Sequence, residues 1–126
     1  MQTRDDTPVR WVGSSKKDLL AFPKQVVADF GYALGVAQLG GKHPDAKPWK
    51  GEGPGVFEVV KRADGDAFRL IYTIQFAEAI YVLHAFQKKS PKGVATDRRD
   101  IELVQQRLKL AQQHHAATML RPKQKD

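Results

Sequence analysis

At 126 residues the chain is long enough for one modest hydrophobic core and too short for two ordinary domains. Its 21 Lys and Arg against 14 Asp and Glu give a formal net charge of +7, which favours a polyanionic partner, either nucleic acid or an acidic protein. Because it has no cysteine, no signal-peptide core and no apolar run of membrane-spanning length, the sequence excludes disulfides and thiol catalysis and predicts a soluble, cytoplasmic protein.

The N-terminal third contains one strand signal and two helix signals. Residues 1–8 are polar and predict a disordered N-terminus, and the alternation over 9–12 predicts a short strand. Ser14 or Ser15 can cap a short helix, and Pro23 suits the first position of a second helix. We expect these two helices to form a hairpin. Apolar residues recur at helical spacing along the second one: Val26, Val27, Phe30, Leu34 and Ala37.

The middle of the chain changes from loop to strand composition. Glycine, proline, lysine and histidine dominate 39–55, which predicts a long exposed connection. Three strand candidates follow at 55–62, 67–75 and 78–86, with Ala-Asp-Gly-Asp at 63–66 as a hairpin turn signal. We expect an antiparallel meander, which the N-terminal strand could join.

A final helix follows the lysine cluster at 88–92. Thr96 or Asp97 can cap it, and the basic segment 116–126 predicts a flexible tail. The sequence therefore predicts a single α+β domain over 9–115, with an N-terminal strand and a helix hairpin packed on an antiparallel sheet of about four strands and a C-terminal helix. The buried stripe of that helix should be Ile101, Val104, Leu108 and Ala111.

Arg69 lies among apolar residues of the middle predicted strand, so a stiff element presents its guanidinium. One interpretation is a phosphate clamp, since a planar and permanently charged fork suits a phosphate whose negative charge grows in the transition state. The other is a structural ion pair with Glu58 or Glu78.

Further cations and one histidine are candidates for the same chemistry. His84 could transfer protons near neutral pH or be an ordinary packing residue. Trp49 could stack on a base or belong to the core. The other histidines have no suitably placed partner ligand, and no nucleotide-binding motif is present, so we predict no metal and no cofactor. Seven cations could grip an RNA backbone or form a solvated surface: Lys47, Lys50, Lys61, Arg62, Lys88, Lys89 and Lys92.

Several segments together resemble a known family. They are Lys47-Pro-Trp-Lys-Gly-Glu-Gly, Phe68-Arg-Leu-Ile-Tyr, Val82-Leu-His-Ala-Phe-Gln-Lys-Lys-Ser, and Gln106-Arg-Leu in the last helix. The chain is similar to the RelE/HigB toxins of bacterial toxin–antitoxin systems, in their phage-derived, HigB-like branch, over roughly residues 9–112.

This resemblance implies the RelE-like fold and a small basic endoribonuclease that cleaves mRNA on the ribosome without a metal and is silenced by a helix-turn-helix, HigA-like antitoxin. In that chemistry the ribose 2′-hydroxyl attacks the adjacent phosphate, so the site needs a base, a cation and an acid. Arg69 matches the family's strand arginine at the scissile phosphate, and Lys88 or Lys89 matches the cation just past the last strand.

The sequence also departs from the family pattern. Glu58 and Val60 stand where RelE toxins carry lysines, and no tyrosine follows the lysine cluster. The acid and base therefore stay unassigned, with Glu58 or His84 as candidate base and Lys88 as support for the leaving group. Two alternatives follow from this departure: a non-enzymatic toxin that inhibits a protein target such as DNA gyrase, or an inactive phage-derived binding module.

Overall fold

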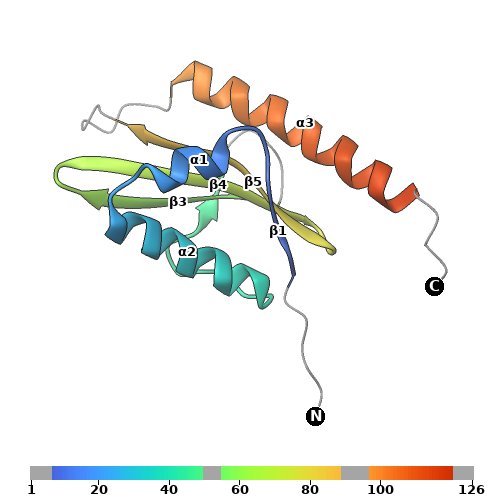
Figure 1. The fold of residues 1–126 in the computed structure, drawn as a ribbon, viewed down its shortest axis with the longest axis horizontal. Coiled ribbons are helices and arrows are strands. Elements are labelled where there is room, and N and C mark those ends of the chain that lie inside the picture. The colour runs from blue at the N-terminus through green and yellow to red at the C-terminus, as the bar shows by residue number, and fades with distance from the viewer. Residues whose placement is uncertain (1–6, 50–54, 89–96, 121–126) are drawn as a thin grey trace, which may run out of the picture.

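The structure, a computed structural model, describes residues 7–49, 55–88 and 97–120. In chain order its elements are β1 (Val9–Trp11), α1 (Ser15–Leu20), α2 (Lys24–Gln38), β2 (Lys47–Pro48), β3 (Val56–Ala63), β4 (Asp66–Phe76), β5 (Ala79–Lys88) and α3 (Arg98–Leu120). The strands form one sheet in the order β1-β5-β4-β3-β2. α1 and α2 cover one face of this sheet, and α3 lies across the other (Figure 1).

The predicted α+β fold is confirmed, with corrections to the sheet. It has five strands where we expected about four, because the short strand β2 lies inside the predicted 39–55 connection and pairs with β3. That connection is also less exposed than predicted, since Ala46 and Trp49 are buried. β1 joins the sheet parallel to β5, with Val9 opposite Ile80, so the sheet is mixed rather than wholly antiparallel.

The helix boundaries follow the predicted signals closely. Pro23 stands immediately before α2, and the Asp97 carboxylate accepts a hydrogen bond from the backbone N–H of Arg99 at 2.9 Å, as an N-cap does. Ser14 precedes α1, but its hydroxyl donates to the Asp18 carboxylate instead of capping the backbone. α3 continues to Leu120, beyond the point where the sequence predicted a flexible tail.

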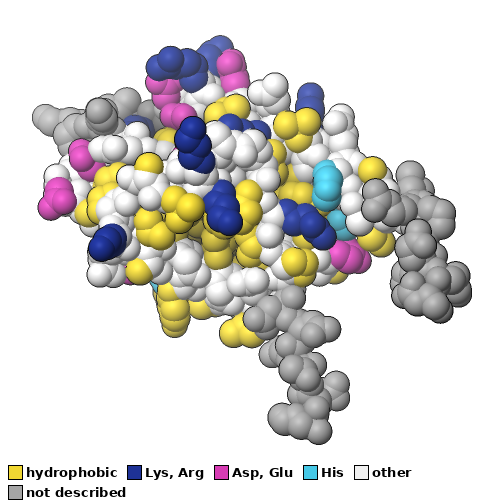
Figure 2. Space-filling model, viewed as in Figure 1, with side chains coloured by type: hydrophobic (Ala, Val, Ile, Leu, Met, Phe, Trp, Pro, Cys, Tyr) yellow, Lys and Arg dark blue, Asp and Glu magenta, His cyan; other side chains and the backbone are white. Residues whose placement is uncertain are grey.

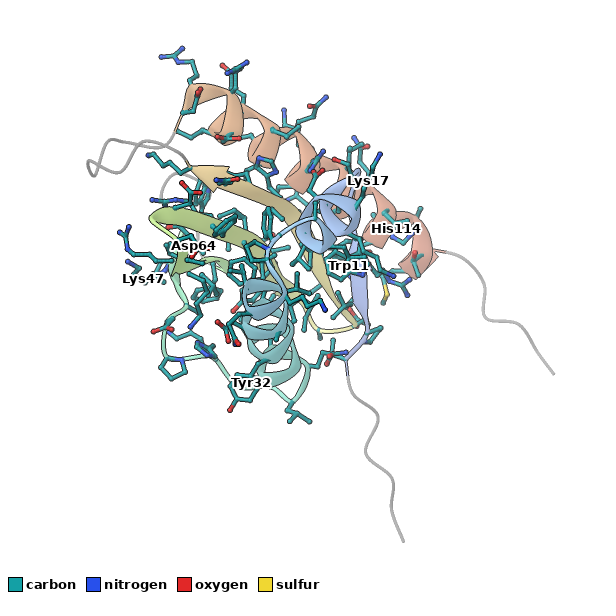
Figure 3. The ribbon with its side chains drawn as sticks, turned by 60° about the vertical axis from the view of Figure 1, so that its left-hand side comes forward. Trp11, Lys17, Tyr32, Lys47, Asp64 and His114 are labelled. Atoms are coloured by element: carbon teal, nitrogen blue, oxygen red, sulfur yellow. The ribbon has the colours of Figure 1, made fainter. Side chains whose placement is uncertain are left out.

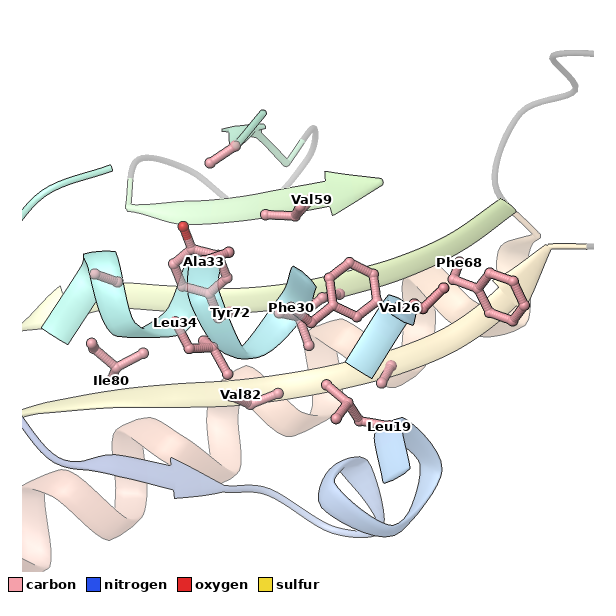
Figure 4. Packing of buried hydrophobic residues seen from close by; sticks show 14 residues of the cluster. Leu19, Val26, Phe30, Ala33, Leu34, Val59, Phe68, Tyr72, Ile80 and Val82 are labelled. Atoms are coloured by element: carbon pink, nitrogen blue, oxygen red, sulfur yellow. The ribbon is translucent and has the colours of Figure 1, made fainter. Parts of the chain in front are cut away.

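Two hydrophobic clusters sandwich the sheet. The larger lies between the sheet and α1–α2, where Phe30, Leu70 and Tyr72 are almost completely buried (Figure 4). The smaller lies under α3, where Val104 packs with Ile71 and Leu83. None of the helices in the described ranges is both long and apolar enough to cross a membrane.

The turn between β3 and β4 fixes the register of the central strands. Asp64 and Gly65 both have positive φ, 52° and 83°, as the two central residues of a type I′ hairpin require. The two-residue loop sets Ala63 opposite Asp66, and this register continues along the hairpin to set Val60 opposite Arg69.

We expect Gly65→Ala to lower the free energy of unfolding by about 1 kcal/mol, because a Cβ is unfavourable at positive φ. Gly31→Ala is the matched control, since this helical glycine has open space around its Cα. That control should raise stability by about 0.5–1 kcal/mol. Urea titration of both variants measures the two values, and equal effects of the same sign would contradict the assigned turn.

Candidate functional site

Strand register brings those predicted catalytic residues that the structure describes to one face of the sheet. Residues directly opposite each other on neighbouring strands point to the same face. Glu58, Ile71 and His84 form one row across β3, β4 and β5, and Lys47 on β2 extends that row. The face is the one covered by α3, because Ile71 belongs to the cluster that contains Val104.

The next rows toward the β3–β4 turn complete this surface. Arg69 lies between Val60 and Phe86, in the row after that of Glu58 and His84 on the same face. The row after that contains Arg62, Ala67 and Lys88. Since neighbouring strands are about 4.8 Å apart, Glu58 and His84 stand about 10 Å from one another at the backbone, with the Arg69 strand between them. We call this surface the β3–β5 site: Lys47, Glu58, Arg62, Arg69, His84 and Lys88.

Arg69 and Glu58 form an ion pair between Nη1 and Oε2. Their side chains are 19% and 13% exposed, so the pair is mostly removed from water. The Nε of Arg69 is buried and makes no hydrogen bond. The guanidinium is therefore anchored at one nitrogen, and its remaining hydrogen-bonding capacity is unused within the described part of the chain.

His84 pairs with Asp100 in the first turn of α3. The Nε2···Oδ1 distance is 2.8 Å, and the imidazole stacks on the Phe86 ring with centroids 4.5 Å apart. A carboxylate can only accept, so Nε2 carries the proton and Nδ1 of the neutral ring carries the lone pair. Nδ1 is buried without a hydrogen-bond partner. This geometry suits a proton acceptor.

Burial lowers the pKa of His84 below its usual value, and the Asp100 carboxylate offsets only part of that effect. Arg107 lowers the pKa further, whereas Asp18 raises it slightly. The imidazole is therefore predominantly neutral at neutral pH, which is the protonation state that a general base needs.

This shift predicts how stability depends on pH. The unfolded chain binds a proton at His84 near pH 6.5, whereas the folded chain binds it only at lower pH. Stability should therefore be fully present above about pH 6.5 and be lost as the pH falls through the folded pKa. Comparing urea unfolding of wild type and His84→Gln from about pH 7.5 to about pH 5 isolates this contribution. A parallel pH dependence in the two proteins would contradict it.

The remaining predicted residues are distributed unevenly. Lys61 lies opposite Phe68, on the other face of the sheet, and its Nζ is 2.7 Å from the Asp45 carboxylate, so it does not join the β3–β5 site. That lysine lowers the pKa of Asp45 by donating to it. Trp49 is 6% exposed and packs in the α3-side cluster, so its ring is not free to stack on a base. Lys50, Lys89 and Lys92 lie outside the described residues.

Asp100 is the one site residue that the sequence interpretation missed. An acidic residue at the start of a helix is explained by its favourable interaction with the helix dipole, and its position suggests no other role. Its partner, His84, lies 16 residues earlier on the preceding strand, and no local pattern links the two residues. No group of three or more His, Asp or Glu side chains within the described ranges could hold a metal ion.

Comparison with known proteins identifies a family for this chain. Residues 17–109 match the family described as phage-derived protein Gp49-like (DUF891), and this range covers most of the chain. The chain belongs to this family. The expectation of a phage-derived family is thereby confirmed. A search of curated proteins finds no match.

Among solved structures, the Gp49-like chain aligns with one chain of a toxin–antitoxin complex and with the toxin RelE. A chain of the RelBE2 toxin–antitoxin complex from Mycobacterium tuberculosis aligns with a TM-score of 0.45 and 23% identity over 66% of this chain and 99% of that one. A mutant of the Escherichia coli toxin RelE in the free state aligns with a TM-score of 0.52 and 14% identity, covering 82% of this chain and 96% of the toxin. The isolated RelE toxin in another crystal form gives 0.52 and 14%, with 79% and 97% covered. The two RelE alignments show that the Gp49-like chain has the RelE fold.

Proposed function

We propose that this Gp49-like protein is the toxin of a toxin–antitoxin system and that it cleaves mRNA on the ribosome. One observation carries the proposal. Arg69, whose Nε has no hydrogen-bond partner, and a neutral His84, whose Nδ1 has none, lie on the same face of the sheet in adjacent rows. A cation and a base on one surface are what attack by a ribose 2′-hydroxyl on the adjacent phosphate requires.

His84 is the general base in the proposed mechanism. Once RNA binding uncovers Nδ1, which is buried in the free protein, this nitrogen accepts the 2′-hydroxyl proton while the bond between O2′ and phosphorus forms. Asp100, 2.8 Å from Nε2, fixes the tautomer and ring orientation and stabilises the imidazolium that results. Asp100 is thus a positioning residue and does not itself touch the substrate.

Arg69 binds the non-bridging phosphate oxygens as negative charge accumulates on them. Glu58 orients the guanidinium through the Nη1 contact, so we assign Glu58 to positioning rather than to proton abstraction. The bond between phosphorus and O5′ breaks, and Lys88 gives the leaving oxygen its proton. The products are a 2′,3′-cyclic phosphate and a 5′-hydroxyl. DNA lacks the 2′-hydroxyl and is not a substrate.

The surrounding cations hold the RNA backbone. Lys47 and Arg62 are exposed on the same face as Arg69. We propose that Lys50, Lys89 and Lys92 join them in this role. Binding should weaken steeply with salt, because each phosphate contact releases a condensed counterion. In a cell, the proposed cognate antitoxin is a helix-turn-helix protein.

A second candidate function is favoured by the same ion pair. A carboxylate bound to Arg69 neutralises much of the positive charge that a scissile phosphate would need. This favours a non-enzymatic toxin that binds a protein target such as DNA gyrase, with the Arg69–Glu58 pair as a purely structural feature.

Controlled expression in a bacterial host separates the two candidates. Wild type is compared with the double variant Glu58→Gln/Arg69→Met, which removes the guanidinium without leaving a buried charge unpaired. We expect growth arrest and new 5′-hydroxyl ends within translated reading frames for wild type, and neither for the double variant. Arrest with intact transcripts would reject RNA cleavage and favour the protein-target toxin.

A further inference from the structure

A hollow lies between β1 and α3, away from the β3–β5 site. It has a volume of about 460 Å³ and is bounded by β1 and the C-terminal half of α3. A second hollow on α1, lined by Lys16, Lys17 and Leu20, shares Gly13 with the first. The two hollows flank Gly13, and we call the surface that they bound together the β1–α1 groove. Residues that line its first part include Arg10, Tyr81, Leu110 and His114.

The groove combines unpaired cations with exposed apolar side chains. Arg10, Lys16 and Lys17 are exposed, and none of them forms an ion pair within the described part of the chain. Leu20 is 58% exposed and Leu110 is 48% exposed. Figure 2 shows Lys and Arg side chains set among hydrophobic ones on the face that carries β1 and α1.

Polar groups beside the groove mostly satisfy one another. The nearby carboxylate of Asp18 accepts a hydrogen bond from Ser14 at 2.7 Å, and the Tyr81 hydroxyl lies 2.7 Å from Nδ1 of His114. The guanidinium of Arg107 donates to Leu83 O and to Ser14 Oγ. The charge left for an occupant is therefore positive, and it comes from the three exposed cations.

The backbone offers a second means of attachment. β1 is an edge strand, with β5 on one side and no strand on its outer side among the described residues. Unpaired edges accept an added strand from another chain, in which backbone hydrogen bonds supply affinity and side chains supply specificity. An occupant that lies along β1 would meet Arg10 first and then, past Gly13, the lysines of α1.

We infer that the β1–α1 groove binds an extended segment of a partner protein in which acidic residues alternate with apolar ones. The carboxylates would pair with Arg10, Lys16 and Lys17, and the apolar side chains would cover the exposed Leu20 and Leu110. Figure 3 shows Trp11, Lys17 and His114 together beside α3, apart from Lys47. The partner would therefore leave the β3–β5 site uncovered, and its binding does not depend on RNA cleavage.

A random library of short peptides, each about a dozen residues long, tests this inference. Selection uses the full chain carrying Glu58→Gln/Arg69→Met, so that production of the protein does not depend on whether the wild type is toxic. We expect enriched peptides to contain Glu or Asp between apolar residues. A fluorescein-labelled peptide of this kind should lose at least about tenfold in affinity when Arg10→Glu and Lys17→Glu are added, and its Gln-substituted version should bind equally weakly.

Two controls make the result specific to the groove. Lys24→Glu reverses one positive charge, as each groove substitution does, but at an exposed position of α2. It should leave the affinity for the peptide unchanged. Lys47→Glu/Arg62→Glu makes the same double reversal at the β3–β5 site. Enrichment without acidic residues, or a loss of affinity confined to the Lys47/Arg62 pair, would overturn the inference. Circular dichroism melts confirm that each variant is folded before binding is measured.

Discussion

His84→Gln is expected to slow mRNA cleavage on programmed ribosomes by about two to four orders of magnitude, the usual contribution of a positioned general base. Glutamine keeps a hydrogen bond to Asp100 but has no atom that can take a proton near neutral pH. The loss should appear in the single-turnover cleavage rate and not in ribosome binding, because the imidazole acts on the 2′-hydroxyl in the transition state.

The pH profile tests the direction of proton transfer. With His84 as base, the wild-type rate should rise with pH through the lowered pKa of the imidazole and reach a plateau near neutrality. Asp100→Asn should reduce the cleavage rate less than His84→Gln does. It should also shift the pH at which the rate rises, which the loss of a merely structural contact would not do. His115→Gln, a histidine outside the β3–β5 site, is the control. A rate that falls across this range would make His84 the acid and return Glu58 to the role of base.

Arg69→Ala is expected to lower the free energy of unfolding by about 3 kcal/mol, because it leaves the Glu58 carboxylate unpaired in a mostly buried position. The double variant Glu58→Gln/Arg69→Met should recover most of this loss, since no charge then remains without a partner. Guanidinium unfolding of wild type, Glu58→Gln, Arg69→Met and the double variant gives the coupling energy directly, with Arg69→Ala measured alongside.

This cycle also protects the functional assay from misinterpretation. Loss of toxicity in Arg69→Ala alone could reflect unfolding, whereas loss in a stable double variant reflects the missing guanidinium. Arg69→Lys keeps the charge and the contact to Glu58 but lacks the planar fork, so it should be stable and at least about tenfold less active. If Arg69→Ala were as stable as wild type, the pair would be solvated and its anchoring role would be wrong.

The sequence predicted the helices and strands better than the contacts between them. Pro23, Asp97 and the Asp64–Gly65 turn are local signals, because each specifies backbone geometry within a few residues. β2 escaped prediction because a two-residue strand containing proline has no periodicity, and only its pairing with β3 makes it a strand.

The candidate site was predictable in part from the same turn. A two-residue hairpin loop at 64–65 fixes which residues face each other, so the placement of Lys61 away from Arg69 follows from the two-residue period of a strand. The pairing of His84 with Asp100 does not follow from such a rule. It depends on where α3 packs against the sheet, and no local pattern in the sequence specifies that position. Burial of Trp49 was likewise unpredictable from its basic neighbours in sequence.

The parallel pairing of β1 with β5 has a consequence for synthesis. β3, β4 and β5 are consecutive hairpins and can assemble locally, whereas Val9 must wait for Ile80, far along the chain, before β1 has a strand to pair with. Asp100 reaches His84 later still, with the first turn of α3. During translation the ribosome would therefore hold a nascent chain whose histidine has no orienting carboxylate, and catalytic competence would arise only once α3 has left the exit tunnel.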